Sequence, residues 1–430
     1  MTSVSLQARV GELERRYLNG TFAELCRIES PSGCERRCAE RVIAELRALG
    51  VSAHEDEAGA LVGSDCGNLL ARIPAEVTSG FGGGERLGYS AVEGEGLGGP
   101  AVEGEGLEGS AERAEGRAGS CLLLCAHLDT PPLERQVEPV LIDGSWANAN
   151  DGPLGARSKA AVAVLLALAR HVRRAGAPVP VELLFTVDGE RSLGGARALD
   201  LAALRSSTGY AFDHAAPIGG VVLSAPSRFR IEACFHGASA AGGRSPQPGG
   251  SAIAAAARAI AAMPLGAVHE ERTVRIDTVS GNAARGELGE RCSLVAEVSA
   301  LTDVCAEALV GELVERVHEA ANLPECACDV DVTVERSFAG YRLPATRPAV
   351  QAAEAALHAC GFEPERIASG AGSDANALMA RGLQIVNLAN GIERGDDGGE
   401  RVRAATLEAM LEVALALLDA VEAPSVELAR

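Results

Sequence analysis

Short apolar segments alternate with longer amphipathic ones along most of the chain. Apolar runs bounded by Gly, Pro, Asp or Asn predict buried strands, and these lie at 51–57, 68–73, 120–126, 181–187 and 210–213. Apolar positions with helical spacing predict helices at 158–173 and 193–204. Strands that alternate with helices in this way are typical of a largely parallel sheet with helices on both faces. We therefore predict an α/β domain.

The order of the predicted elements changes between residues 221 and 336. It becomes strand, helix, strand, strand, helix, strand, at 229–235, 250–263, 273–279, 293–301, 304–321 and 329–335. This β-α-β-β-α-β order is that of a ferredoxin-like unit. Two further helices then flank a strand, at 348–360, 403–421 and 384–388. We predict that residues 1–220 and 337–430 form one α/β domain into which residues 221–336 are inserted.

Residues 78–119 differ in composition from the rest. Gly, Glu and Ala dominate this segment, and the string AVEGEGL occurs at 91–97 and again at 101–107. Such a composition buries too little apolar surface to offset the entropy cost of ordering the chain. We predict a disordered acidic insertion.

Charge and composition exclude several classes of protein. The 430 residues carry a formal net charge of −20, so no diffuse positive field is available to hold nucleic acid or an anionic membrane. The apolar run at 160–169 is about half as long as the roughly 20 residues of a membrane span. The amino terminus lacks the apolar core of a secretory signal. Twelve cysteines without a CxxC pair indicate reduced core residues. We expect a cytoplasmic protein that binds neither nucleic acid nor membranes.

Candidate chemistry lies at the ends of three predicted strands. His127 and Asp129 follow the strand at 120–126, Glu190 follows the strand at 181–187, and Asp213 ends the strand at 210–213. Ligands of open α/β sheets bind at the carboxyl ends of the strands. A carboxylate near a histidine can fix the tautomer of a metal ligand, and such donors suit zinc. The same residues also fit an ordinary polar strand end.

Several longer runs of the chain occur in a characteristic order and spacing. They are IESPSG (28–33), CLLLCAHLDT (121–130), LGARSKAAVAVLLALARH (154–171), LLFTVDGERSLGGARALD (183–200), YAFDHAAP (210–217), FHGASAAGGRSP (235–246), RSFAGYRLP (336–344) and AGSDANALMARGLQIVNL (371–388). In this order and spacing they resemble the M20 metallopeptidases, and most closely their peptidase T-like branch. The resemblance implies a zinc-peptidase-like α/β/α catalytic domain with an inserted ferredoxin-like lid and dimerisation domain. It also implies a homodimer that acts as a zinc-dependent aminopeptidase on short peptides or related amides.

The resemblance assigns roles to individual positions. His127 and Asp213 match ligands of a first zinc ion, Glu190 matches a ligand of a second, and Asp129 matches the aspartate that orients the histidine. Five positions depart from the family pattern. Arg157 stands where an aspartate bridges the two ions, and Gly189 stands where a glutamate acts as general base. A histidine ligand and two lid residues are replaced at Asp396, Ala241 and Gly286.

These departures bear on activity and on metal. A guanidinium stays protonated and cannot ligate zinc, and loss of a general base costs about 10²- to 10⁴-fold in rate. We expect one weak zinc site rather than two, or no zinc at all, and little or no hydrolysis. One alternative is an inactive paralogue kept for peptide binding or assembly. The other is an active hydrolase with a rebuilt one-metal site, for which further ligands would come from Asp151, Asp188, His214, Asp396 and Asp397.

Overall fold

The computed structural model describes residues 10–76, 121–133, 135–239, 250–269, 272–282, 289–394 and 399–422. The insertion predicted at 78–119 lies outside the described residues. The same holds for Ala241, Gly286, Asp396 and Asp397.

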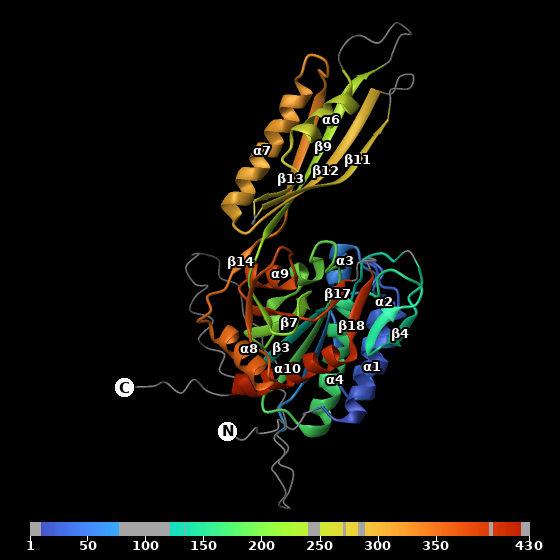
Figure 1. Cartoon of the computed structure of the whole chain (residues 1–430), viewed down its shortest axis with the longest axis vertical. Coiled ribbons are helices and arrows are strands. Elements are labelled where there is room, and N and C mark those ends of the chain that lie inside the picture. Colours follow the sequence, from blue (N-terminus) through green and yellow to red (C-terminus); the bar gives the residue numbers. More distant parts are fainter. Residues whose placement is uncertain are drawn as a thin grey trace, which may run out of the picture.

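The larger domain is built on a nine-stranded mixed sheet (Figure 1). Its order is β1-β2-β6-β3-β7-β16-β8-β14, and β15 also pairs with β8. These strands are β1 (Ala53–Glu55), β2 (Leu69–Ile73), β3 (Leu122–His127), β6 (Val181–Thr186), β7 (Thr208–His214), β8 (Gly220–Ala225), β14 (Tyr341–Arg342), β15 (Glu365–Ala368) and β16 (Gln384–Ala389).

The prediction of a largely parallel sheet is right only for the centre of this sheet. Strands β6, β3, β7 and β16 are parallel neighbours, whereas β2 runs antiparallel to β6, and β8 runs antiparallel to β16. Strand β8 follows β7 after a short loop, without the crossover helix that a parallel strand requires, and so runs in the opposite direction. The parallel centre is the part that carries the site.

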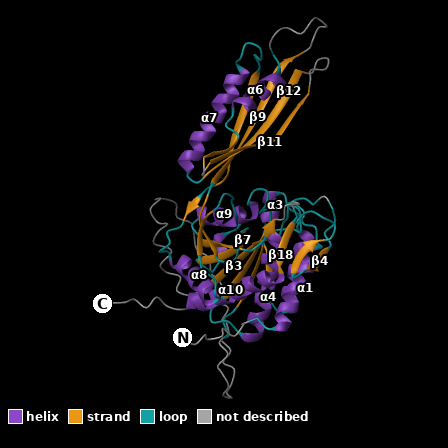
Figure 2. Ribbon diagram, in the orientation of Figure 1, coloured by secondary structure: helices purple, strands orange, loops and turns teal. Residues whose placement is uncertain are grey.

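Helices cover the sheet, and the α/β architecture expected from the sequence is confirmed (Figure 2). Helix α4 packs against β3 and β7 and has α1 and α10 beside it, while α3, α5 and α9 form a second group. Residues 160–169 of α4 are all buried, which explains why this stretch is apolar on every side. The helices are α1 (Glu12–Cys26), α2 (Arg36–Ala48), α3 (Ala58–Val62), α4 (Ala156–Ala175), α5 (Gly194–Ala198), α8 (Pro348–Ala359), α9 (Asp374–Ala380) and α10 (Ala404–Glu422).

The single helix predicted at 193–204 is wrong. Helix α5 ends at Ala198, and Leu199 adopts an extended conformation with ψ of 131°. The Asp200 side chain then accepts a hydrogen bond from the Ala202 N–H and starts a separate 3₁₀ turn, Leu201–Ala203. An aspartate side chain that bonds to the backbone two residues further on favours a new turn over the continuation of a helix.

The inserted unit has a five-stranded antiparallel sheet with two helices and stands apart from the main domain in Figure 1. Its strand order is β10-β11-β12-β9-β13, and its core is separate from that of the main domain. The elements follow the predicted order with one short additional strand, β10. They are β9 (Ser227–Ser239), α6 (Ala252–Ala262), β10 (Gly266–His269), β11 (Arg272–Asn282), β12 (Gly289–Ala300), α7 (Asp303–Ala321) and β13 (Asp329–Phe338).

The chain enters the inserted unit later than the sequence suggested. Residues 221–225, assigned to the insertion from the sequence, lie in β8 and pair with β16 and β15 of the main sheet. Strand β9 begins at Ser227, and Phe338 at the end of β13 already packs in the core of the main domain. The apolar residues of β8 did not show to which of the two cores the strand belongs, because a buried strand has the same apolar pattern in both.

A small sheet at the side of the main domain was not expected from the sequence. Its order is β17-β18-β5-β4, built from β4 (Pro139–Ile142), β5 (Ser145–Asn148), β17 (Glu393–Arg394) and β18 (Glu400–Arg403). It brings a segment near the carboxyl terminus to the start of α4. In the part of the chain that the structure describes, no helix is both long and apolar enough to span a bilayer.

Candidate functional site

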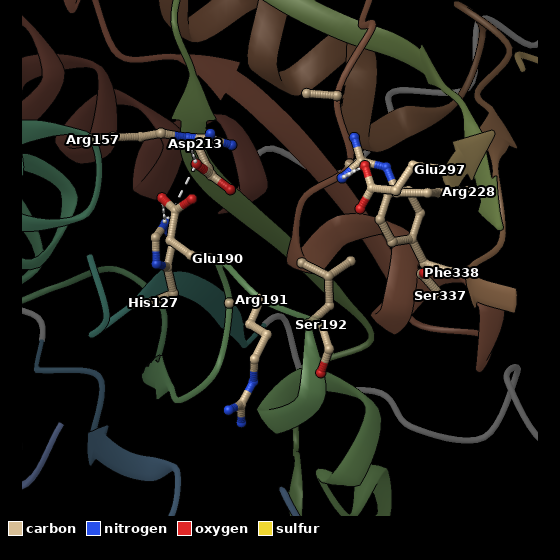
Figure 3. A pocket seen from close by; sticks show the side chains of 14 residues that line it. His127, Arg157, Glu190, Arg191, Ser192, Asp213, Arg228, Glu297, Ser337 and Phe338 are labelled. Carbon is tan, nitrogen blue, oxygen red and sulfur yellow. Dashed lines mark hydrogen bonds and ion pairs between the residues drawn. The ribbon is translucent and has the colours of Figure 1, made fainter. Parts of the chain in front are cut away.

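Three side chains meet where the parallel strands of the main sheet end. His127 is the last residue of β3, Asp213 lies near the end of β7, and Glu190 follows β6. His127 Nε2 is 3.6 Å from Asp213 Oδ1 and 4.0 Å from Glu190 Oε1 (Figure 3). Because β6, β3 and β7 are parallel neighbours, their carboxyl ends share one edge of the sheet.

Asp129 fixes both His127 and the turn that carries Glu190. Its Oδ1 lies 3.0 Å from His127 Nδ1, and its buried carboxylate also accepts the Ser32 hydroxyl at 2.6 Å. The backbone N–H groups of Gly189 and Glu190 each donate to it at 2.9 Å. Burial favours the neutral acid, but the bonds from His127 and Ser32 hold the pKa of Asp129 below its usual value. Asp129 is therefore an anion surrounded by donors.

Arg157 occupies the centre of the site. It lies in the first turn of α4, and its Nε donates to Asp213 Oδ1 at 2.9 Å. Burial would raise the pKa of Asp213, but Arg157 and His127 outweigh it and lower that pKa to about 2. Burial opposes the charge on His127, yet its bonds to Asp129 and Asp213 hold its pKa well above the usual value. Asp213 thus lies between the Arg157 guanidinium and the His127 ring, and both favour its ionised form.

Glu400 holds the start of α4, and with it Arg157. Its Oε2 accepts the N–H groups of Leu154 and Ala156 at 3.1 and 3.0 Å. These are N–H groups at a helix start, which otherwise lack partners. No sequence signal pointed to Glu400, because 244 positions separate it from Ala156. The small sheet containing β18 brings the two together.

Gly189 has no room for a side chain. A Cβ atom built on its backbone would lie 2.7 Å from His127 Cβ and 2.8 Å from His127 Cγ. The backbone cannot easily move away, since its N–H is bonded to Asp129. The residue that stands at the expected general-base position is therefore glycine in a turn that excludes larger residues.

Lys159 holds the loop that follows strand β3. This lysine is 1% exposed, and its Nζ donates to the Leu128 carbonyl at 2.9 Å, to the Ser30 hydroxyl and to Cys38 Sγ at 3.1 Å. Nothing in the sequence pattern around Lys159 indicated this role. Three bonds to chain segments distant in sequence explain how a buried ammonium is tolerated and hold the loop after β3 in place.

The residues present do not fit a pair of metal ions. Within the described ranges, no group of three or more His, Cys, Asp or Glu side chains is arranged to hold a metal ion. His127, Glu190 and Asp213 lie close together, but the permanently charged guanidinium of Arg157 is paired with the carboxylate of Asp213. A guanidinium cannot coordinate a cation and repels one at this distance.

Three of the other residues considered as ligands of a single metal ion make their contacts away from His127. Asp188 pairs with Arg191 Nε at 2.7 Å and accepts the Ser192 hydroxyl. Asp151 is exposed, and His214 Nδ1 lies 3.4 Å from the Ser369 hydroxyl. None of these three forms an ion pair or hydrogen bond with His127 in the described structure.

A pocket of about 120 Å³ opens beside Arg157, between the two domains (Figure 3). His127, Arg157, Glu190 and Asp213 line it from the main domain. The opposite wall includes Arg228 and Glu297 of the inserted unit, with Ser337 and Phe338 at the end of β13. The Arg228 guanidinium lies over the Phe338 ring, 5.1 Å from its centre. The pocket is thus lined by residues of both domains.

Known proteins resemble the chain over nearly its whole length. The model of peptidase family M20/M25/M40 matches residues 123–420. The uncharacterized protein YqjE of Bacillus subtilis (strain 168) is 26% identical over 407 residues, which cover 94% of this chain and 98% of that protein.

Two solved structures extend the likeness to three dimensions. Aminopeptidase PepT from Bacillus cereus ATCC 10987 superposes with a TM-score of 0.72 at 27% identity, over 95% of this chain and 98% of that one. A tripeptidase from Staphylococcus aureus subsp. aureus Mu50 superposes with a TM-score of 0.76 at 25% identity, with the same coverage of 95% and 98%.

Proposed function

The chain belongs to peptidase family M20/M25/M40, whose model matches residues 123–420, and from this we propose that it binds short peptides or related amides with little or no hydrolysis. Peptides are the natural ligand class to propose, because the similar solved structures are an aminopeptidase and a tripeptidase. The observation that carries the loss of turnover is the bond from Arg157 Nε to Asp213 Oδ1 at 2.9 Å.

Amide hydrolysis needs a group that takes a proton from water and a group that stabilises the developing oxyanion. Asp213 is held by Arg157 and His127, and Asp129 is surrounded by four donors, so neither carboxylate is available as a base. Glu190 remains, but a carboxylate alone is a poor base for water with a pKa of about 15.7. Gly189 offers no side chain. The site supports binding better than turnover.

We expect the purified full-length protein to hydrolyse di- and tripeptides such as Ala-Ala and Ala-Ala-Ala at the rate of the protein-free control. Release of free alanine is measured with and without added zinc, and with and without a chelator. The Bacillus cereus aminopeptidase serves as a positive control for the assay. Chelator-sensitive hydrolysis that His127→Ala abolishes would contradict the proposal and would favour a rebuilt one-metal site.

We also propose that the protein is a homodimer joined through the inserted unit. An open sheet edge supports this: β11 pairs with β10 only through residues 272–274, so its later residues have no strand on that side in the described structure. Val279 on this stretch is 56% exposed. An unpaired edge strand is a ready template for a second copy.

Sedimentation velocity of the full chain should therefore show a dimer, and Val279→Lys should shift it to the monomer. Lysine on an edge strand opposes strand pairing between chains. Val304→Lys is the matched control, because Val304 is 76% exposed in the same unit but lies in the first turn of helix α7 and not on the sheet edge. A monomeric unmodified protein, or equal effects of both substitutions, would refute the proposed interface.

A further inference from the structure

We propose that the pocket beside Arg157 binds a single α-amino acid unit with a free ammonium and a free carboxylate group. The carboxylate would bind the Arg157 guanidinium, and the ammonium would bind Glu190. This inference rests on the proposed function, because it concerns the same pocket in which short peptides or related amides are proposed to bind.

The Arg157 guanidinium has N–H groups available to a ligand. Its Nε bonds to Asp213, and in the described structure its two terminal nitrogens have no hydrogen-bond partner. The side chain is 28% exposed, and it lines the pocket. The planar fork of arginine matches the two oxygens of a carboxylate. The Nε bond to Asp213 fixes the orientation of this fork before any ligand arrives.

Glu190 is the complementary acceptor. Its carboxylate receives no hydrogen bond from the described residues, and its nearest charged partner is His127 Nε2 at 4.0 Å. The side chain is 20% exposed and lines the same pocket. Arg157 and Glu190 form no ion pair with each other. An ammonium group, with three N–H donors, would satisfy Glu190 without displacing Arg157 from Asp213.

The other charged groups of the pocket are already paired. Arg191 Nε forms an ion pair with Asp188 Oδ1 at 2.7 Å, and Glu297 Oε2 accepts a hydrogen bond from Arg275 Nη2 at 2.7 Å. Arg228, on the wall formed by the inserted unit, donates to the Ser299 hydroxyl through Nε and lies 3.8 Å from Glu297 through Nη1. On the main-domain side of the pocket, the Arg157 terminal nitrogens and the Glu190 carboxylate are left without a hydrogen-bond partner among the described residues. A cation alone would meet the charge of Arg157, and an anion alone would meet Glu190 and Asp213. A zwitterion would place its carboxylate at Arg157 and its ammonium at Glu190, so its charges would complement those of the pocket.

The size of the pocket fits one amino acid rather than a whole peptide. Its volume is about 120 Å³. Pockets for drug-sized ligands are larger, at about 300 to 1,000 Å³. A longer peptide would have to extend out of the pocket.

The test is isothermal titration calorimetry on the unmodified full-length protein with L-alanine, N-acetyl-L-alanine, L-alaninamide and Ala-Ala. We expect L-alanine to bind at least tenfold more tightly than either blocked form. Equal affinity for L-alanine and a blocked form would overturn the inference. If Ala-Ala binds and L-alanine does not, the inference fails while the proposed function stands. If no compound binds, both fail.

Two pairs of variants assign the two ends of the ligand. Arg157→Gln should lower the affinity for L-alanine at least tenfold, whereas Arg191→Gln, which removes a paired arginine of the same pocket, should leave it unchanged. Glu190→Gln should have the same effect as Arg157→Gln, with Glu297→Gln as its control. Thermal melts establish that each variant is folded. Equal losses in a variant and its control would contradict the assignment, and the ligand series above tests the inference without any substitution.

Discussion

Replacing Gly189 with glutamate is expected to leave peptide hydrolysis at background and to destabilise the protein by about 1–3 kcal/mol, the usual cost of overpacking. The substitution restores the residue type expected of a general base. However, a Cβ at this position would lie 2.7 Å from His127 Cβ and 2.8 Å from His127 Cγ. The new side chain must therefore displace His127 or the turn held by Asp129. Urea unfolding and the alanine-release assay measure the two effects.

Two control substitutions separate the clash from the added charge. Gly189→Ala adds the Cβ atom without a carboxylate and should lose most of the same stability. Gly311→Glu places glutamate in helix α7, where a Cβ meets nothing within 4 Å, and should not destabilise the protein. A Gly189→Glu variant as stable as the unmodified protein, or one that hydrolyses Ala-Ala, would show that the turn at Gly189 adapts.

Arg157→Asp is expected to destabilise the metal-free protein by about 3–5 kcal/mol, the cost of breaking a buried ion pair. Asp213 has a side chain only 10% exposed and depends on Arg157 for its charge balance. The new carboxylate would add to the repulsion and would leave Asp213, Glu190 and His127 without the guanidinium between them. These are the donors that zinc prefers.

Zinc should therefore recover the stability of Arg157→Asp while leaving that of the unmodified protein unchanged. A ligand present at 100 times its dissociation constant stabilises the folded state by about 2.7 kcal/mol. Urea unfolding with and without zinc, together with the metal content after dialysis, measures this difference. Arg191→Asp is the control, since Arg191 lines the same pocket but pairs with Asp188. Two tightly bound zinc ions per unmodified chain would refute the prediction.

The order of elements could be predicted from the sequence because it depends on local patterns. Helical spacing of apolar residues predicted the helix at 158–173, and the strands that end near His127, Glu190 and Asp213 were visible as apolar segments. Since neighbouring parallel strands end at one edge of a sheet, the sequence also indicated which polar residues would meet there. The runs that resemble the M20 peptidases identified the family, which the match over residues 123–420 confirms.

Other features depend on contacts between segments far apart in the chain. The sequence showed arginine at position 157, but only the folded structure shows its Nε on Asp213, with its remaining donors facing the pocket. Likewise, glycine at position 189 was visible as a missing base, whereas the contact with His127 that excludes a side chain was not.

The boundary of the inserted unit and the support of α4 were decided in the same way. Strand β8 belongs to the main sheet through its pairing with β16, and Glu400 reaches Leu154 and Ala156 across the small sheet. Hydrophobic periodicity records which face of an element is buried, but it does not record which distant element covers that face. Residue types and strand ends were therefore determined by the sequence alone. Charge pairing, steric room and the free donors of the pocket were decided by the tertiary structure, because each depends on atoms brought together from separate segments.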